Sequence, residues 1–311
     1  MPRIAHGTRD EHGRWHPDDP TQYPPMDVHG TLPWSVLDAT TPRWRDRVKW
    51  WRDRGVDDIT PRAHAAGMIA TGRHGRISGG VSRFDPHLAE VLLTWFCPPR
   101  GHVLDPFAGG PVRGLVAAHL GLRYTGVDLS AAQVTANRAR AREWQEAGLL
   151  PHTPEWVWGD ALTVLPTLPS ETADYAYTCP PYHNRERYSD DPRDLSAMSW
   201  PAFVEAHAAV IQETVRILKP DRLVTWVIGD VRDHRGYLRG LPALTVEAFR
   251  RAGAHLINEQ ILITPAGLLA KTMRPAWEAA RTTTRRHQHV LTFVKGDRRR
   301  AAAAIQHKGQ R

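Results

Sequence analysis

The sequence predicts an α/β fold in which a doubly wound, mostly parallel sheet carries helices on both faces. From residue 84 onwards, short apolar runs typical of buried strands alternate with longer segments whose apolar residues recur at helical spacing. Four consecutive predicted strands end in an acid or a proline-rich turn, at the edge where such sheets bind ligands. The 311 residues suit one large domain with an extension, and a hydrophobic content of 41% is enough for a core.

Residues 1–75 are rich in proline, glycine, histidine and charge. We predict that they form a largely irregular basic arm with one helix near residues 41–54, where Trp44, Val48 and Trp51 recur at helical spacing. Two interpretations of this helix stay open. Its basic side chains contact phosphates, or its tryptophans dock on the main domain while the basic groups are solvated. We favour docking.

The main domain is predicted over residues 76–297, with a frayed basic tail at 298–311. Its first helix spans 86–96 and ends before two prolines. Apolar runs then predict strands at 103–107, 123–129, 155–158, 174–178, 223–228, 256–263 and 289–295. Helices are expected at 111–120, 130–147, 200–218 and 244–252, the second of them opened by a capping-box pattern. The polar residues 183–199 and the basic residues 266–288 are predicted as loops.

A loop of small residues follows the first strand of this alternation. The strand reaches Asp105, and the glycine loop (residues 106–110) then leads into a helix. In this layout backbone N–H groups can approach a cofactor that contains a nucleoside. Asp128 follows at about the 20-residue spacing that suits ribose hydroxyls, and Asp160 is placed to accept a hydrogen bond from an adenine amino group. Taken singly, each aspartate is equally well explained as a helix cap or a solvated loop residue.

The Pro-Pro-Tyr turn (residues 179–182) ends another strand. Its two prolines fix the backbone and remove two N–H donors, so carbonyl oxygens can point into a site. Such a carbonyl accepts a hydrogen bond from an exocyclic amino group and favours attack of the nitrogen on an electrophilic methyl. Tyr182 offers a flat face on which an extruded base can stack, worth roughly 1–3 kcal/mol. The alternative is a merely rigid corner. Cys179 is interpreted as a packing residue and not as a nucleophile.

Charge and cysteine content narrow the class of protein. A formal net charge of +8 predicts a polyanionic partner such as nucleic acid, although an arginine-rich soluble chain would have the same charge. The 2 cysteines give neither a disulfide framework nor a metal cluster, so no metal site is predicted. Without a signal-like N-terminus or an apolar run near ~18 residues, we expect a cytoplasmic protein of a bacterium, or a phage protein in the host cytoplasm, with no membrane partner.

Residues 105–110 and 178–182 together resemble the S-adenosylmethionine-dependent DNA amino-methyltransferases, which modify N6 of adenine or N4 of cytosine. The closer resemblance is to phage-type and actinobacterial DNA modification methylases, and it extends through 33–39, 188–192, 227–233 and 289–297. It implies a Rossmann-like class I methyltransferase sheet of seven strands, the last antiparallel. It also implies S-adenosylmethionine as cofactor and direct in-line transfer to a flipped base of double-stranded DNA. A restriction endonuclease partner, the oligomeric state and the target base stay open.

The resemblance also implies a role for individual residues. It assigns cofactor binding to Phe84, Asp105, Phe107, Ala108, Gly109, Gly110, Asp128 and Asp160. It assigns the target amine and base to Cys179, Pro180, Pro181 and Tyr182. Two residues depart from the family pattern. Pro111 removes a backbone donor beside the cofactor, and Cys179 replaces a side chain that is usually a better acceptor, so polarisation falls mainly on the Pro180 carbonyl.

Three hypotheses therefore remain. We favour a DNA amino-methyltransferase over a DNA-binding protein of the same fold without turnover, for which Pro111 and Cys179 are the support, and over an RNA amino-methyltransferase. Methylation of a small molecule makes up the remainder. The expected DNA contacts are the basic arm and the loops 183–199 and 266–288, with the candidate arginines Arg185, Arg187, Arg274, Arg281, Arg285 and Arg286.

Overall fold

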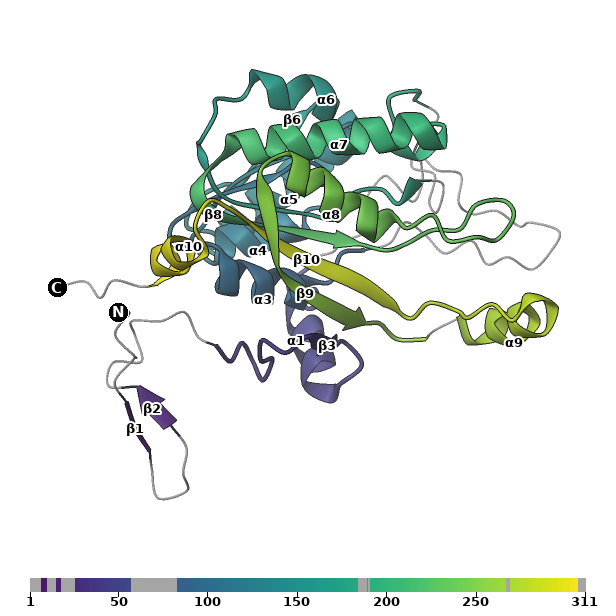
Figure 1. The fold of residues 1–311 in the computed structure, drawn as a ribbon. Helices are drawn as coiled ribbons and strands as arrows, with labels where there is room; N and C mark the ends of the chain where they lie inside the picture. The colour runs from purple at the N-terminus through teal and green to yellow at the C-terminus, as the bar shows by residue number, and fades with distance from the viewer. Residues whose placement is uncertain are drawn as a thin grey trace.

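One sheet of eight strands organises the main domain of the computed structural model (Figure 1). The structure describes residues 7–9, 15–17, 26–56, 83–183, 189, 191–266 and 269–306. The strand order is β3-β9-β10-β8-β7-β4-β5-β6. The strands are β3 Val36–Asp38, β4 His102–Asp105, β5 Arg123–Asp128, β6 Glu155–Trp158, β7 Ala173–Thr178, β8 Leu218–Ile228, β9 Ala254–Ile263 and β10 His287–Lys295. A separate antiparallel pair consists of β1 Gly7–Arg9 and β2 Trp15–Pro17.

The strand directions confirm the predicted fold class. Strands β8, β7, β4, β5 and β6 are parallel to one another, whereas β10 is antiparallel to both of its neighbours, β8 and β9. The expected count of seven strands is wrong, because β3 from the N-terminal arm pairs in parallel with β9. Only Leu37 in this 3-residue strand is buried, so the sequence contains no alternation to reveal it. The added strand covers part of the β9 edge.

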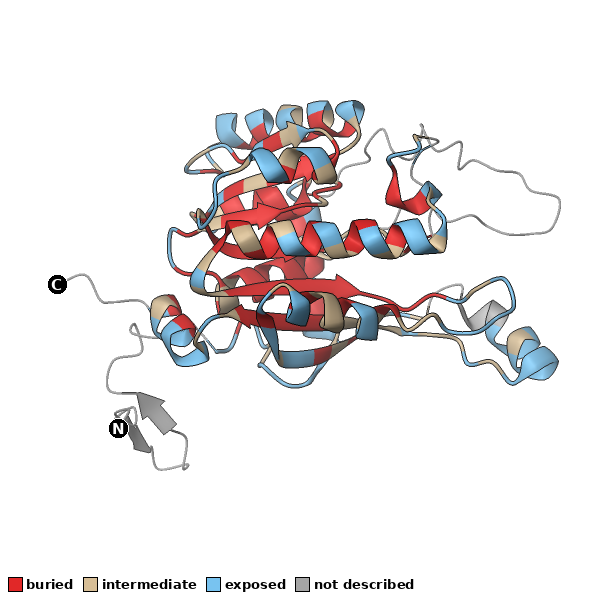
Figure 2. Ribbon diagram, turned by 45° about the horizontal axis from the view of Figure 1, so that its top comes forward, coloured by how far each residue is buried: buried red, intermediate tan, exposed pale blue. Residues whose placement is uncertain are grey.

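Helices cover both faces of the sheet. They are α1 Pro42–Arg52, α3 Pro86–Phe96, α4 Val112–His119, α5 Ala131–Glu146, α6 Ala161–Val164, α7 Trp200–Ile217, α8 Leu241–Arg251, α9 Leu269–Ala280 and α10 Arg298–Ile305. One face packs against α1, α3, α4, α5 and α10, and the other against α6, α7 and α8. Along β4, Val103 belongs to the first core and Leu104 to the second, as strand alternation requires. Strand β7 is buried along its whole length, and the interior of the sheet is red in Figure 2.

Two segments predicted without regular structure are helical. The predicted loop 266–288 contains α9, whose internal Pro275 argues against a helix from sequence alone. The predicted frayed tail contains α10, which Asp297 caps by accepting hydrogen bonds from the backbone N–H groups of Arg299 and Arg300. The predicted domain boundary near residue 75 lies outside the described residues. Within the described part of the chain, no helix is both long and apolar enough to cross a bilayer.

A buried carboxylate holds α1 against α3. The tryptophan face of α1 is buried, as the docking interpretation predicts, with Trp51 0% exposed. Glu90 of α3 is 3% exposed and accepts hydrogen bonds from Arg47 Nε at 2.8 Å and Trp51 Nε1 at 3.0 Å. His87 Nδ1 lies 3.1 Å from Glu90, and His29 Nε2 lies 3.3 Å from it. Burial alone would raise the pKa of Glu90, but hydrogen bonds from Arg47, His87 and Trp51 outweigh it and lower the pKa to about 2.

We expect the Glu90→Gln variant to be less stable than the native protein at neutral pH by about 3 kcal/mol. This value follows from the fall in pKa from 4.5 to about 2 on folding. Because the folded pKa lies below the unfolded value, the contribution is complete above about pH 4.5 and is lost as the pH falls towards 2. Urea unfolding of both proteins between pH 7 and 3 checks this. A difference in stability that does not shrink with acidification would contradict it.

Candidate active site

The carboxyl ends of five parallel strands meet at one edge of the sheet. Between β4 and β7 the chain order reverses, because β4 leads to β5 on one side whereas β7 neighbours β8 on the other. In open α/β sheets, ligands bind in the crevice at such a reversal. Asp105 ends β4, Asp128 ends β5, and Thr178 ends β7. The strand ends that carry the predicted site residues therefore meet at one crevice.

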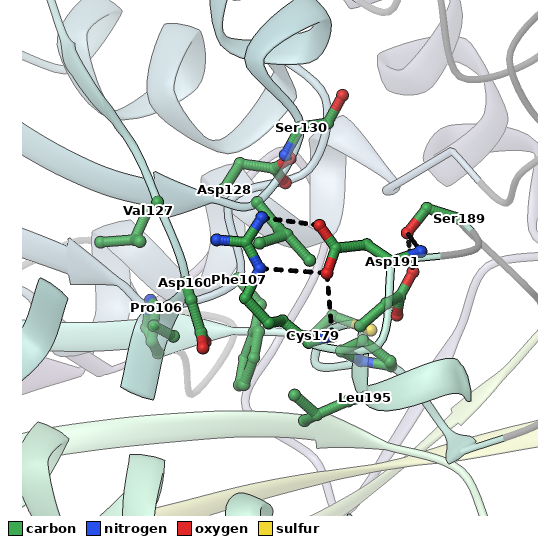
Figure 3. A pocket seen from close by; sticks show the side chains of 16 residues that line it. Pro106, Phe107, Val127, Asp128, Ser130, Asp160, Cys179, Ser189, Asp191 and Leu195 are labelled. Atoms are coloured by element: carbon green, nitrogen blue, oxygen red, sulfur yellow. Dashed lines mark hydrogen bonds and ion pairs between the residues drawn. The ribbon is translucent and has the colours of Figure 1, made fainter. Parts of the chain in front are cut away.

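A cavity of about 230 Å³ lies at this edge (Figure 3). Its lining comes from the glycine loop, the ends of β5 and β6, the Pro-Pro-Tyr turn and the segment after that turn. Five predicted site residues line it: Phe107, Asp128, Asp160, Cys179 and Pro181. The other predicted residues lie outside the lining: Phe84, Asp105, Ala108, Gly109, Gly110, Pro180 and Tyr182. Residues predicted to bind the cofactor and residues predicted to hold the base thus line the same cavity.

Asp128 holds the glycine loop. It is 5% exposed, and its Oδ2 accepts a hydrogen bond from Gly109 N at 2.8 Å while Oδ1 accepts one from Ser130 N at 2.9 Å. Gly109 has a left-handed φ of 56°, and its carbonyl accepts from Asn137 Nδ2 at 2.8 Å. Ala108 N donates to the Val127 carbonyl at 2.8 Å. The N–H groups of residues 108 and 109 are therefore bonded within the protein, and do not point to a cofactor.

Asp160 both caps a helix and lines the cavity. Its side chain is 8% exposed, and Oδ1 accepts a hydrogen bond from Leu162 N at 3.0 Å at the start of α6. Asp160 is therefore a helix cap, as the alternative interpretation predicted. The same side chain also lines the cavity. Phe107 adds an aromatic wall, with its ring edge-to-face with Trp226 at a centroid distance of 6.2 Å.

Asp105 lies beneath the cavity and is 0% exposed. Its Oδ1 accepts hydrogen bonds from Thr178 Oγ1 at 2.6 Å and Phe107 N at 3.2 Å. Its Oδ2 accepts from Arg113 Nε at 2.6 Å and Tyr124 OH at 2.8 Å. Burial alone would lower the pKa of Arg113, but the adjacent Asp105 carboxylate outweighs it and raises that pKa above its ordinary value. Burial, followed by Asp105, raises the pKa of Tyr124.

Phe84 also lies beside this buried pair. Its ring packs edge-to-face with Tyr177 at 5.5 Å, and the Arg113 guanidinium lies 4.7 Å from its centroid. Phe84 is half-buried, whereas Gly110 is not crowded and an added Cβ would meet nothing within 4 Å. Neither residue lines the cavity.

Tyr182 packs against Gly229, directly after the end of β8. Its hydroxyl accepts a hydrogen bond from Gln288 Nε2 at 3.0 Å and lies 3.1 Å from Cys179 Sγ. The half-buried ring covers Gly229 so closely that a Cβ there would lie 3.0 Å from Tyr182 Cε2. Gln288, at the start of β10, is a residue that sequence analysis missed. No local motif marks it, because its partner lies far away along the chain.

The segment after the turn forms another wall of the cavity. Ser189, Asp191, Arg193, Asp194 and Leu195 all line it, and the resemblance had given them no role. Arg193 binds Asp191 through two hydrogen bonds, Nε to Oδ1 at 3.0 Å and a terminal nitrogen to Oδ2 at 2.7 Å (Figure 3). Ser189 Oγ donates to Asp194 Oδ2 at 2.9 Å, and Asp194 caps the short helix that follows. The predicted contacts Arg185 and Arg187 lie outside the described residues.

Part of the sequence is similar to that of a known methyltransferase. The chain is 25% identical over 137 residues to the type II methyltransferase M.BglII from Bacillus subtilis. The match covers 44% of this chain and 34% of the relative, so the chain spans about a third of the relative's length. No family model matches the sequence.

Solved structures give the same kind of likeness. A candidate DNA modification methylase from Thermus thermophilus, complexed with S-adenosyl-L-methionine, has a TM-score of 0.34 and 22% identity, over 45% of this chain and 52% of that chain. A SAM-dependent methyltransferase from Methanosarcina mazei has a TM-score of 0.44 and 14% identity, over 65% and 95%. These TM-scores lie below 0.5, so the function is inferred from the residues of the site.

Proposed function

We propose that this chain is an S-adenosylmethionine-dependent methyltransferase that methylates an exocyclic amino group, N6 of adenine or N4 of cytosine, in double-stranded DNA. One observation carries the proposal. Asp128 and Asp160 line the same cavity as Cys179 and Pro181 of the Pro-Pro-Tyr turn. The resemblance to DNA amino-methyltransferases and the partial match to a type II methyltransferase support the same function.

The residues of the cavity fit a nucleoside cofactor. Asp128 offers a carboxylate for ribose hydroxyls, and Asp160 offers one for an adenine amino group. Phe107, Val127 and Leu195 supply apolar and aromatic surface for the faces of a purine ring. S-adenosylmethionine, when bound, supplies an electrophilic methyl group on a sulfonium.

The Pro-Pro-Tyr turn suits the amine. Residues 180 and 181 have no N–H, so the polar groups that this backbone can present to a base are carbonyl oxygens. An amino group that donates to such a carbonyl keeps its nitrogen lone pair free for the methyl carbon. The contact between Cys179 Sγ and Tyr182 OH supports a positioning role for the thiol and not nucleophilic attack. The rate would then come from orientation of the two reactants.

The experiment that tests the proposal compares DNA from a host that expresses the protein with DNA from a host that expresses Tyr182→Ala. Mass spectrometry of the nucleosides is expected to find more N6-methyladenine or N4-methylcytosine with the native protein than with Tyr182→Ala. In vitro, label from S-adenosylmethionine is expected in duplex DNA and not in RNA of the same sequence. Because base–aromatic stacking is worth about 1–3 kcal/mol, Tyr182→Ala should lower transfer roughly 5- to 100-fold, whereas Tyr182→Phe retains the ring. Label in RNA alone, or in neither, would overturn the proposal.

The DNA-binding part of the proposal is supported by α9. The chain beyond the end of β9 and before the start of β10 carries α9 away from the body, and these strand ends lie at the edge that also holds the cavity (Figure 1). Met273 is 55% exposed and Trp277 is 48% exposed, one helical turn apart. The Arg281 guanidinium lies 5.5 Å from the Trp277 ring. An exposed aromatic ring with a neighbouring arginine suits stacking on bases and contact with phosphates.

The other candidate arginines of this region already have partners within the protein. Arg274 Nε donates to Glu278 Oε1 at 2.7 Å, and Arg286 Nε donates to the Thr264 carbonyl at 3.3 Å. Arg285 lies 3.7 Å from Asp230. Arg281 is therefore the arginine best placed to act together with Trp277.

We expect Trp277→Ala to weaken binding of duplex DNA by about 5- to 100-fold, the loss of one stacking contact. Fluorescence anisotropy with a labelled duplex at fixed salt measures this. Trp158→Ala is the matched control, because Trp158 is another exposed tryptophan, at 61%, and it ends β6, outside the segments expected to contact DNA. Equal losses in the two variants, or none in either, would contradict the assignment of α9 to DNA.

A further inference from the structure

We propose that Asp105 is a positioning residue that fixes the glycine loop relative to the Pro-Pro-Tyr turn, and is not itself a cofactor ligand. The inference rests on the proposed function for its kinetic consequence. Its structural part concerns the protein alone. Asp105 is 0% exposed and is absent from the cavity lining, while Pro106 and Phe107, which directly follow it, line the cavity.

One oxygen of Asp105 joins the two halves of the site. Oδ1 accepts a hydrogen bond from Phe107 N, in the glycine loop, and from Thr178 Oγ1, the residue directly before the turn. Backbone pairing of β4 with β7 ends at Leu104 and Ala176. Beyond that point this side-chain bridge links the two chain segments. It spans the crevice floor where the strand order reverses.

The second oxygen anchors the bridge. Oδ2 binds Arg113 of α4, and a terminal nitrogen of Arg113 also donates to the carbonyls of Phe107 and Ala108, the latter at 3.1 Å. The Arg113 side chain is 5% exposed, so water does not compete for these bonds. Arg113 therefore holds the glycine loop from below while Asp105 ties it to β7. A shift of one segment relative to the other requires a break in this network.

This coupling matters for in-line transfer. The cofactor-binding wall and the base-holding turn must keep their reactive groups at near-contact distance, and a misplacement of about 1 Å can cost roughly 10²-fold in rate. A bridge between the two segments sets that distance. Loss of the bridge should therefore change turnover more than it changes affinity for either ligand.

The test removes the Thr178 hydroxyl with Thr178→Val and uses Thr225→Val as a matched control. Both threonines are 0% exposed in strands, and Thr225 bonds a neighbouring strand through Thr292 at 2.9 Å, away from the glycine loop. Hydrogen–deuterium exchange of the protein without ligands is expected to speed up in residues 107–110 and 182–183 of Thr178→Val only. Kinetics are expected to give a kcat at least about tenfold lower, with affinity for S-adenosylmethionine within about threefold. Thr178→Ser, which keeps the hydroxyl, should restore the native exchange rates and the native kcat.

The outcomes separate the inference from the proposed function. Unchanged exchange in Thr178→Val, or equal changes in Thr225→Val, would overturn the bridge whatever reaction the protein performs. A loss of cofactor affinity as large as the loss of kcat would overturn the positioning role and return Asp105 to cofactor binding. If exchange is faster in Thr178→Val only, and the native protein transfers no methyl group to DNA, the bridge is supported and the proposed function alone is refuted.

Discussion

The Asp128→Ala variant is expected to bind S-adenosylmethionine at least about 100-fold more weakly than the native protein. The Asp128 carboxylate accepts hydrogen bonds from Gly109 N and Ser130 N, and the proposed function adds a ribose hydroxyl. Hydrogen bonds to charged groups are worth about 1.5–3 kcal/mol each, and about 1.4 kcal/mol corresponds to a tenfold change in affinity. The change therefore removes a ligand contact and also loosens the loop beneath the cofactor. Isothermal titration calorimetry measures the affinity.

Asp38→Ala is the matched control for this measurement. Asp38 also ends a strand, β3, and its Oδ1 accepts a hydrogen bond from the backbone N–H two residues on, Thr40 N at 2.8 Å. It does not line the cavity. We expect its affinity for S-adenosylmethionine to match that of the native protein. Asp128→Ala binding as tightly as Asp38→Ala would remove Asp128 from the cofactor site.

The Arg113→Met variant is expected to lose about 3–5 kcal/mol of stability, because it leaves the Asp105 carboxylate buried without its cation. Two carbonyls of the glycine loop also lose their donor. Urea denaturation measures the free energy of unfolding. A fall of this size should also lower the melting temperature by roughly 10 °C.

Two further variants identify the cause of that loss. Asp105→Leu combined with Arg113→Met removes both charges, and we expect it to recover part of the stability, since an apolar replacement of a whole buried pair is often nearly neutral. Arg274→Met breaks an exposed pair with Glu278 and should change stability little. A double variant as unstable as Arg113→Met would show that the unpaired charge does not cause the loss, and that packing or the bonds of Thr178 and Tyr124 to Asp105 do.

The main domain could be predicted because its signals are local. The buried strands are continuous apolar runs, and the predicted capping box begins α5, where Ser130 Oγ accepts a hydrogen bond from Gln133 N at 3.2 Å. Segments that depend on distant partners were missed. β3 pairs with the edge of β9, and α10 packs Ala301 and Ile305 into the core and pairs Arg300 with Asp221 of β8. Neither partner is visible from the local pattern.

In the site too, local sequence signals could be predicted, whereas contacts between distant residues could not. In the sequence, Asp105 and Asp128 look alike, because each acid ends an apolar strand. Their surroundings differ only in the folded chain, where Arg113, Tyr124 and Thr178 surround the first and the cavity opens beside the second. Gln288 was likewise invisible, since it acts through a contact with Tyr182 on a distant segment. The wall after residue 188 pairs mainly within itself, but only the fold brings it to the cavity. The residue types predicted the chemistry, whereas the partners of each residue required the fold.

Helix α9 and the strands that carry it are constrained differently: the helix by what it contacts, and the strands by the stability of the sheet. The helix's described side chains over residues 273–280 are all exposed or half-buried, while the strands that support it are held by backbone pairing with the rest of the sheet. Substitutions at the tip therefore leave the free energy of folding nearly unaltered. Under the proposed function, substitutions at this helix would change the preference for one DNA sequence over another while the residues that line the cavity stay the same.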